Sequence, residues 1–249
     1  MFSPAHWLHM QHKKLFSIYR FKRCGIQARE PLHHVEREFV LEFGSAFREP
    51  DLVVYDIGAS DGVVSKALLK LKNVKSIHAF EPIPASFEAL RKRVEGYPEI
   101  VCHNVALGDS NRPTNLHLSG NPYSSSFLPM ADLHEVEFPG SGTSRDIEVE
   151  VVKLDDFIAT HRVPLPDVVK IDVQGFELEV LKGGLSALER AKYCILEMSF
   201  VELYHGAPLF DAVYQFMIAR GFLLRGTGNV IANKFCEPLQ IDGIFRRRD

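Results

Sequence analysis

From residue 51 onward, short apolar runs alternate with stretches in which apolar residues recur every three or four positions. The apolar runs predict strands at 52–57, 76–81, 100–107, 167–172 and 193–200. The segments between them predict helices at 62–72, 85–95, 155–161 and 209–220, and a further helix that ends at Gly183-Gly184. Strands of this length that alternate with helices are typical of an α/β fold with a parallel sheet.

Two regions depart from this alternation. After the last helix, the segments 222–225, 229–235 and 242–247 predict closing strands, some of them antiparallel. Between the third and fourth strands lies an insertion at about 108–150 that is rich in Gly, Ser, Pro and Asn. Its flanks, 115–119 and 147–154, alternate apolar and polar residues as strands do. We therefore expect a hairpin that carries a long loop, which is a lid, a binding segment or disordered.

The N-terminal segment 1–48 differs in character from the domain predicted at 49–249. Residues 1–29 contain six lysines and arginines and no acidic residue. One interpretation is an amphipathic helix whose first 30 residues contact a membrane surface or an anionic acceptor. The other is a helical extension that packs over the edge of the sheet with its cations in solvent. His6, His9 and His12 do not lie on one helical face, which argues against a metal pair there.

Composition narrows the class of protein. The chain has 249 residues, of which 46% are hydrophobic and 24% charged, as in ordinary globular domains. A net charge of -3 gives no reason to expect nucleic acid as a partner. The four cysteines are far apart in the sequence and form no C-x-x-C pair. No apolar run is long enough for a membrane span or a signal peptide, so we expect a cytoplasmic protein.

The most informative segment is VVYDIGASDG (53–62), in which a strand ends at Asp56 and a glycine turn follows. Open α/β sheets bind ligands at the carboxyl ends of their strands, where glycine lets the backbone approach the ligand. The spacing G-x-x-x-G differs from the G-x-G-x-x-G of dinucleotide sites. A turn flanked by Asp56 and Asp61 suits the sulfonium cation of S-adenosylmethionine better than it suits a pyrophosphate.

The next two strands end in further candidate ligands for a nucleoside. Glu81 ends the second strand, and a carboxylate there can accept hydrogen bonds from both ribose hydroxyls. Asn104, near the end of the third strand, either hydrogen-bonds the adenine or terminates the strand. We therefore predict a site for S-adenosylmethionine formed by Asp56, Gly58, Ala59, Asp61, Gly62, Glu81, Pro82, Asn104 and Ala106.

Over residues 51–200 the chain resembles the FkbM family of methyltransferases. The resemblance rests on DIGASDG, FEPIP, NVALGD, VVKLDDFI, ILEMSF and above all VVKIDVQGFELEVLKGG. It implies a class I methyltransferase fold, which is a Rossmann-like, seven-stranded and mostly parallel sheet flanked by helices. It also implies S-adenosylmethionine as the donor and O-methylation of small molecules, often sugars or natural products. The family commonly has an acid where this chain has Gln174.

A methyltransferase that acts on a hydroxyl must remove the hydroxyl proton as the new bond forms. Our first candidate for this base is Asp172, at the end of the fourth strand, which acts directly or by coordinating a divalent cation. Glu197, at the end of the fifth strand, is the second. Glu177 has the alternative role of a first-turn acid that complements the helix dipole, and Asp172 also has the alternative role of a helix cap.

Two other functions stay open at this point. An RNA ribose methyltransferase would use Lys170, Asp172, Lys182 and Glu197 as a lysine–acid constellation, but the domain shows no basic stripe. A non-catalytic protein that binds S-adenosylmethionine would explain why Gln174 replaces an acid. The serines at 124–126, in the insertion, reach the site if the loop folds over it.

Overall fold

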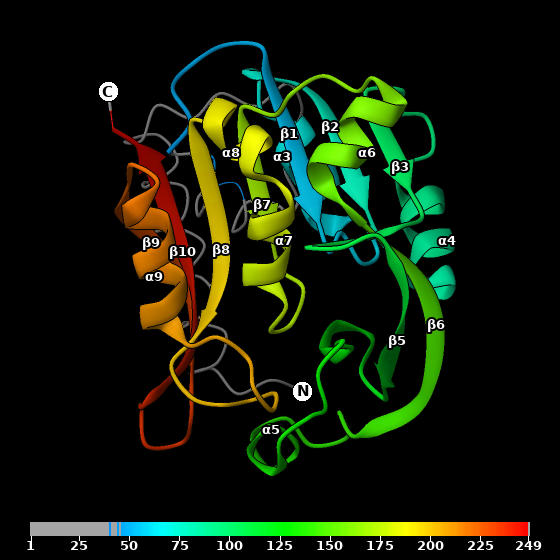
Figure 1. Cartoon of the computed structure of the whole chain (residues 1–249), viewed down its shortest axis with the longest axis vertical. Coiled ribbons are helices and arrows are strands. Elements are labelled where there is room, and N and C mark those ends of the chain that lie inside the picture. Colours follow the sequence, from blue (N-terminus) through cyan, green and yellow to red (C-terminus); the bar gives the residue numbers. More distant parts are fainter. Residues whose placement is uncertain (1–39, 41–43, 45, 249) are drawn as a thin grey trace, which may run out of the picture.

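The computed structural model describes residues 40, 44 and 46–248, and in this part of the chain a seven-stranded sheet forms the centre (Figure 1). Its strand order is β3-β2-β1-β7-β8-β10-β9. The strands are β1 (Leu52–Ile57), β2 (Val74–Phe80), β3 (Ile100–His103), β7 (Val168–Ile171), β8 (Tyr193–Ser199), β9 (Phe222–Ala232) and β10 (Pro238–Arg247). The first five run parallel, and β10 is antiparallel to β8 and β9. The predicted α/β class I methyltransferase fold is confirmed.

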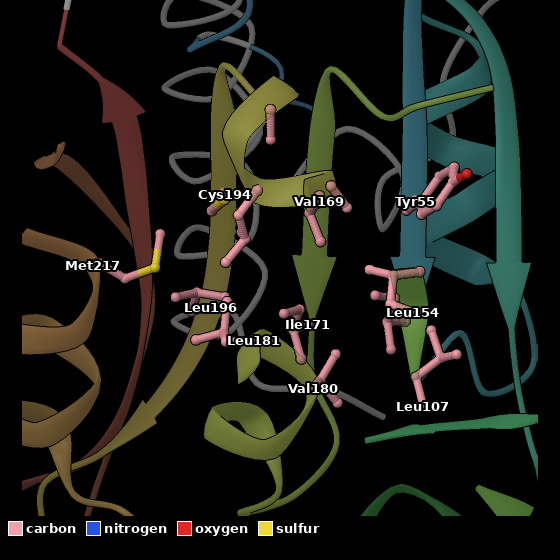
Figure 2. Close-up of a cluster of buried hydrophobic side chains, with 14 of the residues drawn as sticks. Tyr55, Leu107, Leu154, Val169, Ile171, Val180, Leu181, Cys194, Leu196 and Met217 are labelled. Atoms are coloured by element: carbon pink, nitrogen blue, oxygen red, sulfur yellow. The ribbon is translucent and has the colours of Figure 1, made fainter. Parts of the chain in front are cut away.

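Helices cover both faces of this sheet. They are α3 (Val63–Leu69), α4 (Pro84–Arg93), α6 (Leu154–His161), α7 (Glu177–Gly183), α8 (Leu185–Arg190) and α9 (Phe210–Ala219). Helices α3 and α4 pack on one face, and α6 to α9 pack on the other (Figure 1). Figure 2 shows the second core, in which Val169 and Leu196 of the sheet lie beside Leu181 and Met217 of the helices. Strands buried on both faces explain the nearly continuous apolar runs.

Three predicted strands differ in detail from the structure. The run 100–107 is divided between β3 in the large sheet and β4 (Ala106–Gly108), which pairs with a strand of a second sheet. Conversely, 222–225 and the first part of 229–235 belong to one strand, β9, which ends at Ala232 and pairs with β10 through several register shifts. The local apolar pattern therefore does not specify where a strand is interrupted or continued.

The insertion forms a small sheet and an ordered loop beside the carboxyl ends of the parallel strands (Figure 1). Strands β5 (Arg112–Ser119) and β6 (Thr143–Lys153) are antiparallel, which confirms the predicted hairpin. The loop between them contains a 3-10 turn, η2 (Pro122–Ser124), and α5 (Asp132–Glu137). Tyr204, which follows β8, donates toward the carbonyl of Ser124 at 3.0 Å. The loop is therefore attached to the large sheet.

The predictions for the N-terminal extension fall almost entirely outside the described residues, as do the three histidines near its start. Within the part that is described, no helix combines the length and the apolar character needed to cross a membrane.

Candidate functional site

A cavity of about 280 Å³ opens where the insertion meets the carboxyl ends of the parallel strands. Its lining comes from the turns after β1, β2 and β7, from β8, β10 and β9 of the same sheet, and from β4 and the insertion. The described lining contains three carboxylates and no lysine or arginine. The acidic residues are Glu81, Asp172 and Glu197.

The glycine turn after β1 forms the floor of this cavity. Gly58 lies in the left-handed region with a φ of 78°, and a Cβ atom there would stand 1.9 Å from the carbonyl oxygen of Asp172. Gly62 begins α3 with a φ of 81° and packs against Leu90. Gly58 lines the cavity, whereas Gly62 serves the packing of α3 on α4. The first glycine is thus required by the close approach of β1 and β7.

Glu81 is held by two backbone N–H groups at the end of β2. Its Oε2 accepts a hydrogen bond from Ser60 at 2.9 Å, and its Oε1 accepts one from Ile83 at 2.8 Å. Burial raises the pKa of Glu81 to about 7, although both backbone hydrogen bonds lower it. Each oxygen keeps a second lone pair. The carboxylate is therefore fixed in position and can accept two further hydrogen bonds from a ligand.

The other predicted cofactor residues divide into two groups. Gly58, Glu81, Pro82 and Ala106 line the cavity, and Ser60, which was not predicted, joins them. Asn104 instead donates to the carbonyls of Glu81 at 2.8 Å and Pro82 at 3.1 Å. Asn104 thereby supports the segment that carries Glu81. Asp56, Ala59, Asp61, Gly62 and Asn104 are not among the described lining residues.

Asp56 lies beneath the floor in a buried ion pair. Its Oδ1 is 3.1 Å from Nζ of Lys170, and its Oδ2 accepts a hydrogen bond from Ser65 at 2.6 Å. Nζ of Lys170 also lies 3.4 Å from Oδ2 of Asp172. Burial lowers the pKa of Lys170, but the charges of Asp56 and Asp172 outweigh this and raise it above its ordinary value. Lys170 thus stays charged and orients Asp172. Asp61 makes an ion pair with Arg93 on α4.

Gln174 bridges the two predicted catalytic acids. Its Nε2 donates to Oδ1 of Asp172 at 3.0 Å and to Oε2 of Glu197 at 2.7 Å. Its Oε1 accepts a hydrogen bond from the hydroxyl of Tyr204 at 2.8 Å. Its backbone has a φ of 56°, and its carbonyl accepts a hydrogen bond from Ser126 at 2.6 Å. The neutral side-chain amide of Gln174 therefore links Asp172 and Glu197, and the backbone carbonyl of Gln174 contacts the insertion.

The two acids have different environments. Oδ2 of Asp172 lies near Nζ of Lys170, and Oδ1 of Asp172 accepts a hydrogen bond from Gln174. Burial raises the pKa of Glu197 well above its ordinary value, and the negative charges of Asp172 and Glu177 raise it further. The raised pKa of Glu197 makes it the stronger candidate base, while Lys170 and Gln174 hold the carboxylate of Asp172 in position.

Glu177 lies outside the cavity lining and supports the loop before α7. Its Oε1 accepts hydrogen bonds from the N–H groups of Val173 and Gly175, both at 3.1 Å. Burial raises the pKa of Glu177 to about 7. Its position in the first turn of α7 agrees with the structural alternative given by the sequence.

The raised pKa of Glu177 has a measurable effect on stability. A carboxyl whose pKa is raised by folding stabilises the fold at low pH, and this contribution is lost as pH rises from about 4.5 to about 7. The wild type should lose this contribution between pH 5 and pH 8, whereas Glu177→Gln has no such carboxyl to ionise. We therefore expect the unfolding free energy of Glu177→Gln minus that of the wild type to rise by roughly 2–3 kcal/mol over this interval. Urea unfolding at both pH values measures this difference. Glu189→Gln, on the exposed end of α8, is the control; an equal change in both variants would contradict the prediction.

Besides Ser60, three residues of the site were not identified from the sequence, namely Tyr204, His134 and Gln240. The hydroxyl of Tyr204 lies 3.1 Å from Nε2 of His134, and His134 lines the cavity from α5 of the insertion. Burial lowers the pKa of His134 and, together with the negative charge of Glu197, raises that of Tyr204. Gln240 lines the cavity from β10. Each comes from a segment whose position depends on long-range pairing. Of the serines in the insertion, Ser124 and Ser125 line the cavity.

No group of three or more His, Cys, Asp or Glu side chains in the described residues is arranged to hold a metal ion.

Comparisons with known proteins identify the family of this chain. Residues 56–224 match the model of the methyltransferase FkbM domain. The chain is 28% identical over 201 residues to the 2-O-methyltransferase NoeI of Sinorhizobium fredii. The matched region covers 74% of this chain and 83% of the relative. The chain is 31% identical over 150 residues to the hexuronic acid methyltransferase AglP of Haloferax volcanii. This match covers 60% of this chain and 57% of that protein.

Two further proteins carry the family name. The 31-O-demethyl-FK506 methyltransferase FkbM of Streptomyces tacrolimicus is 30% identical over 171 residues, which cover 57% of this chain and 63% of the relative. The crystal structure of a methyltransferase FkbM from Methylobacillus flagellatus gives a TM-score of 0.49 at 15% identity and covers 94% of this chain and 60% of that chain. Since the family model spans more than half of the residues, the chain belongs to the FkbM family of methyltransferases.

Proposed function

We propose that this methyltransferase uses S-adenosylmethionine to methylate a hydroxyl group of a small molecule, with sugars and glycan precursors as the preferred class. The carrying observation is the pair of acids Asp172 and Glu197, bridged by Gln174 in a cavity that also contains Glu81. Relatives named as a 2-O-methyltransferase, a hexuronic acid methyltransferase and a 31-O-demethyl-FK506 methyltransferase support this reaction class.

The residues of the cavity fit S-adenosylmethionine. The donor is a cation, and the described lining offers carboxylates without a competing lysine or arginine. Glu81 would hold the ribose hydroxyls through the free lone pairs of its two oxygens. Gly58 lines the cavity and allows β1 and β7 to approach closely, because a side chain there would meet the carbonyl of Asp172. Asp56 acts on the site indirectly, by holding the ammonium group of Lys170 in place.

When bound, S-adenosylmethionine would supply an electrophilic methyl carbon, with S-adenosylhomocysteine as the leaving group that keeps the electron pair of the broken C–S bond. The acceptor hydroxyl loses its proton as its oxygen forms the new bond, and we assign that proton to Glu197. A carboxylate with a raised pKa is a stronger base, and general bases of this kind typically contribute about 10²–10⁴-fold. A cationic ligand in the cavity also favours the ionised form of Glu197.

Asp172 and Gln174 then position the base. Lys170 and Gln174 each contact one oxygen of Asp172, so this carboxylate is fixed in position. Gln174 cannot take up a proton near neutral pH, because an amide has no titratable site there. It replaces the usual acid as a hydrogen-bond donor that sets the distance between the two carboxylates. Gln174 is thus compatible with catalysis.

The lysine–acid arrangement of an RNA ribose methyltransferase is not assembled in the described residues. Lys170 is 5% exposed and lies between Asp56 and Asp172 outside the cavity lining. Lys182 lies on α7, where it pairs with Glu179 at 3.3 Å. Neither lysine reaches the cavity. The small-molecule acceptor therefore remains our proposal.

Binding of the demethylated nucleoside tests the cofactor assignment. We expect S-adenosylhomocysteine to bind the purified protein, and Glu81→Ala to weaken this binding by about 10- to 100-fold through the loss of charge-assisted hydrogen bonds. Isothermal titration calorimetry measures both. Glu88→Ala is the matched control, because Glu88 is exposed on α4 and pairs with the exposed Arg91. Absence of binding heat in the wild type, or equal affinities of wild type and Glu81→Ala, would overturn the proposal.

A further inference from the structure

Gln240 carries a buried amide that is almost without hydrogen-bond partners. The residue is 5% exposed and lines the cavity from β10. Among the described residues its side chain makes one hydrogen bond, from Nε2 to Oγ of Ser199, at 3.5 Å. This is long, since N–H···O bonds in proteins are normally about 2.7–3.2 Å. The amide oxygen has no partner in the described part of the chain.

The register of the sheet places this amide next to the proposed base. In the antiparallel pair of β8 and β10, Gln240 lies opposite Ser199, and Asp242 lies opposite Glu197. Directly opposite residues project from the same face of a sheet, as do alternate residues of one strand. Gln240 therefore shares a face with Glu197 and lies about 6.8 Å farther along, toward the carboxyl end of β8.

The surroundings of Gln240 indicate which ligand group it suits. Ile231 lies opposite Gln240 on β9 and lines the cavity with it. A hydroxyl group both donates and accepts, so one hydroxyl can satisfy either end of the amide. The described lining has no lysine or arginine that would match an anionic group in the same place.

We propose that Gln240 binds the acceptor by hydrogen-bonding a second hydroxyl group, one that is not methylated. This inference rests on the proposed function and names its acceptor more closely, as a polyhydroxylated molecule that presents two hydroxyls to the same sheet face. Glu197 receives the proton of one hydroxyl, and the Gln240 amide orients the other. Gln240 thereby selects the hydroxyl that is methylated, because only one orientation of the ring satisfies both contacts.

The test uses glycosides that differ by one oxygen. Methyl glucopyranoside, galactopyranoside and mannopyranoside and their monodeoxy derivatives are incubated with the enzyme and methyl-labelled S-adenosylmethionine, and NMR locates the methylated position. We expect that loss of one particular hydroxyl, other than the methylated one, lowers kcat/KM of the wild type by about 10- to 100-fold. Gln240→Leu should show a similar loss on the full glycoside and no further loss on that deoxy derivative.

Controls separate this inference from the proposed function. Gln215→Leu, the same change on the exposed side of α9, should retain wild-type selectivity. Calorimetry should give equal affinities of wild type and Gln240→Leu for S-adenosylhomocysteine. If the wild type binds that nucleoside but methylates no glycoside, or treats all deoxy derivatives alike, the role of Gln240 is refuted. Absence of nucleoside binding would instead refute the proposed function.

Discussion

Replacement of Glu197 by glutamine is expected to lower kcat for methyl transfer by about 10²–10⁴-fold, the usual contribution of a general base. The substitution keeps the size of the side chain and an oxygen that can accept the hydrogen bond from Gln174. It removes the site that takes up the proton. The affinity for S-adenosylhomocysteine should change little, since we assign Glu197 to the proton of the acceptor and Glu81 to the nucleoside. Single-turnover assays combined with calorimetry separate the two effects.

Two matched variants make this result specific. Asp172→Asn should reduce kcat by disturbing the position of the base, and its pH dependence should still show one ionising group. Glu189→Gln, on the exposed surface of α8, should leave the rate unchanged. If Glu197→Gln kept the wild-type rate while Asp172→Asn abolished transfer, Asp172 would be the base and our assignment would be wrong.

Gly58→Ala is expected to destabilise the protein by about 3–5 kcal/mol, a loss that combines overpacking with backbone strain. The new Cβ would stand 1.9 Å from the carbonyl oxygen of Asp172 and 2.9 Å from its carbonyl carbon. Both are backbone atoms, so relief requires that β1 and β7 move apart. Because this movement displaces Asp172, the folded fraction should also lose methyl transfer. Urea unfolding and assays at low temperature measure the two losses.

Gly96→Ala provides the control for backbone strain alone. Gly96 has a φ of 86°, close to the 78° of Gly58, but a Cβ there would meet nothing within 4 Å. We expect Gly96→Ala to cost about 1 kcal/mol, since only the unfavourable φ is involved. Similar losses in both variants would show that the contact with Asp172 is not the reason for glycine at position 58.

The parts of the site that the sequence predicts are those at the ends of parallel strands. Glu81, Asp172 and Glu197 each end an apolar run, and parallel strands bring such ends to one edge of the sheet. The position of each acid at the end of a predicted strand is therefore enough to predict that the three acids lie close together. The sequence does not show which polar groups at that edge face the ligand. Asp56 forms an ion pair with Lys170, and the side-chain amide of Asn104 donates hydrogen bonds to the carbonyls of Glu81 and Pro82.

The residues that the sequence does not reveal depend on pairings between distant segments. Tyr204 meets Gln174 because the segment after β8 bonds to the insertion through the bridge between Met130 and Tyr204. Gln240 reaches the cavity through the antiparallel register of β10, and a shift of one residue would turn it to the opposite face. No local periodicity encodes that register, so these contacts become visible only in the fold.

The small sheet of the insertion has a consequence for how this enzyme can diversify. One continuous excursion of the chain, from β4 to β6, supplies a whole wall of the cavity, including Ser124, Phe127 and His134. The turns after β1 and β2 line the other part of the cavity, which we propose holds the nucleoside. Substitutions within this excursion can remodel the acceptor pocket while the donor pocket stays constant. Acceptor choice and donor binding are thus physically separable, which is a workable basis for altering the former by design.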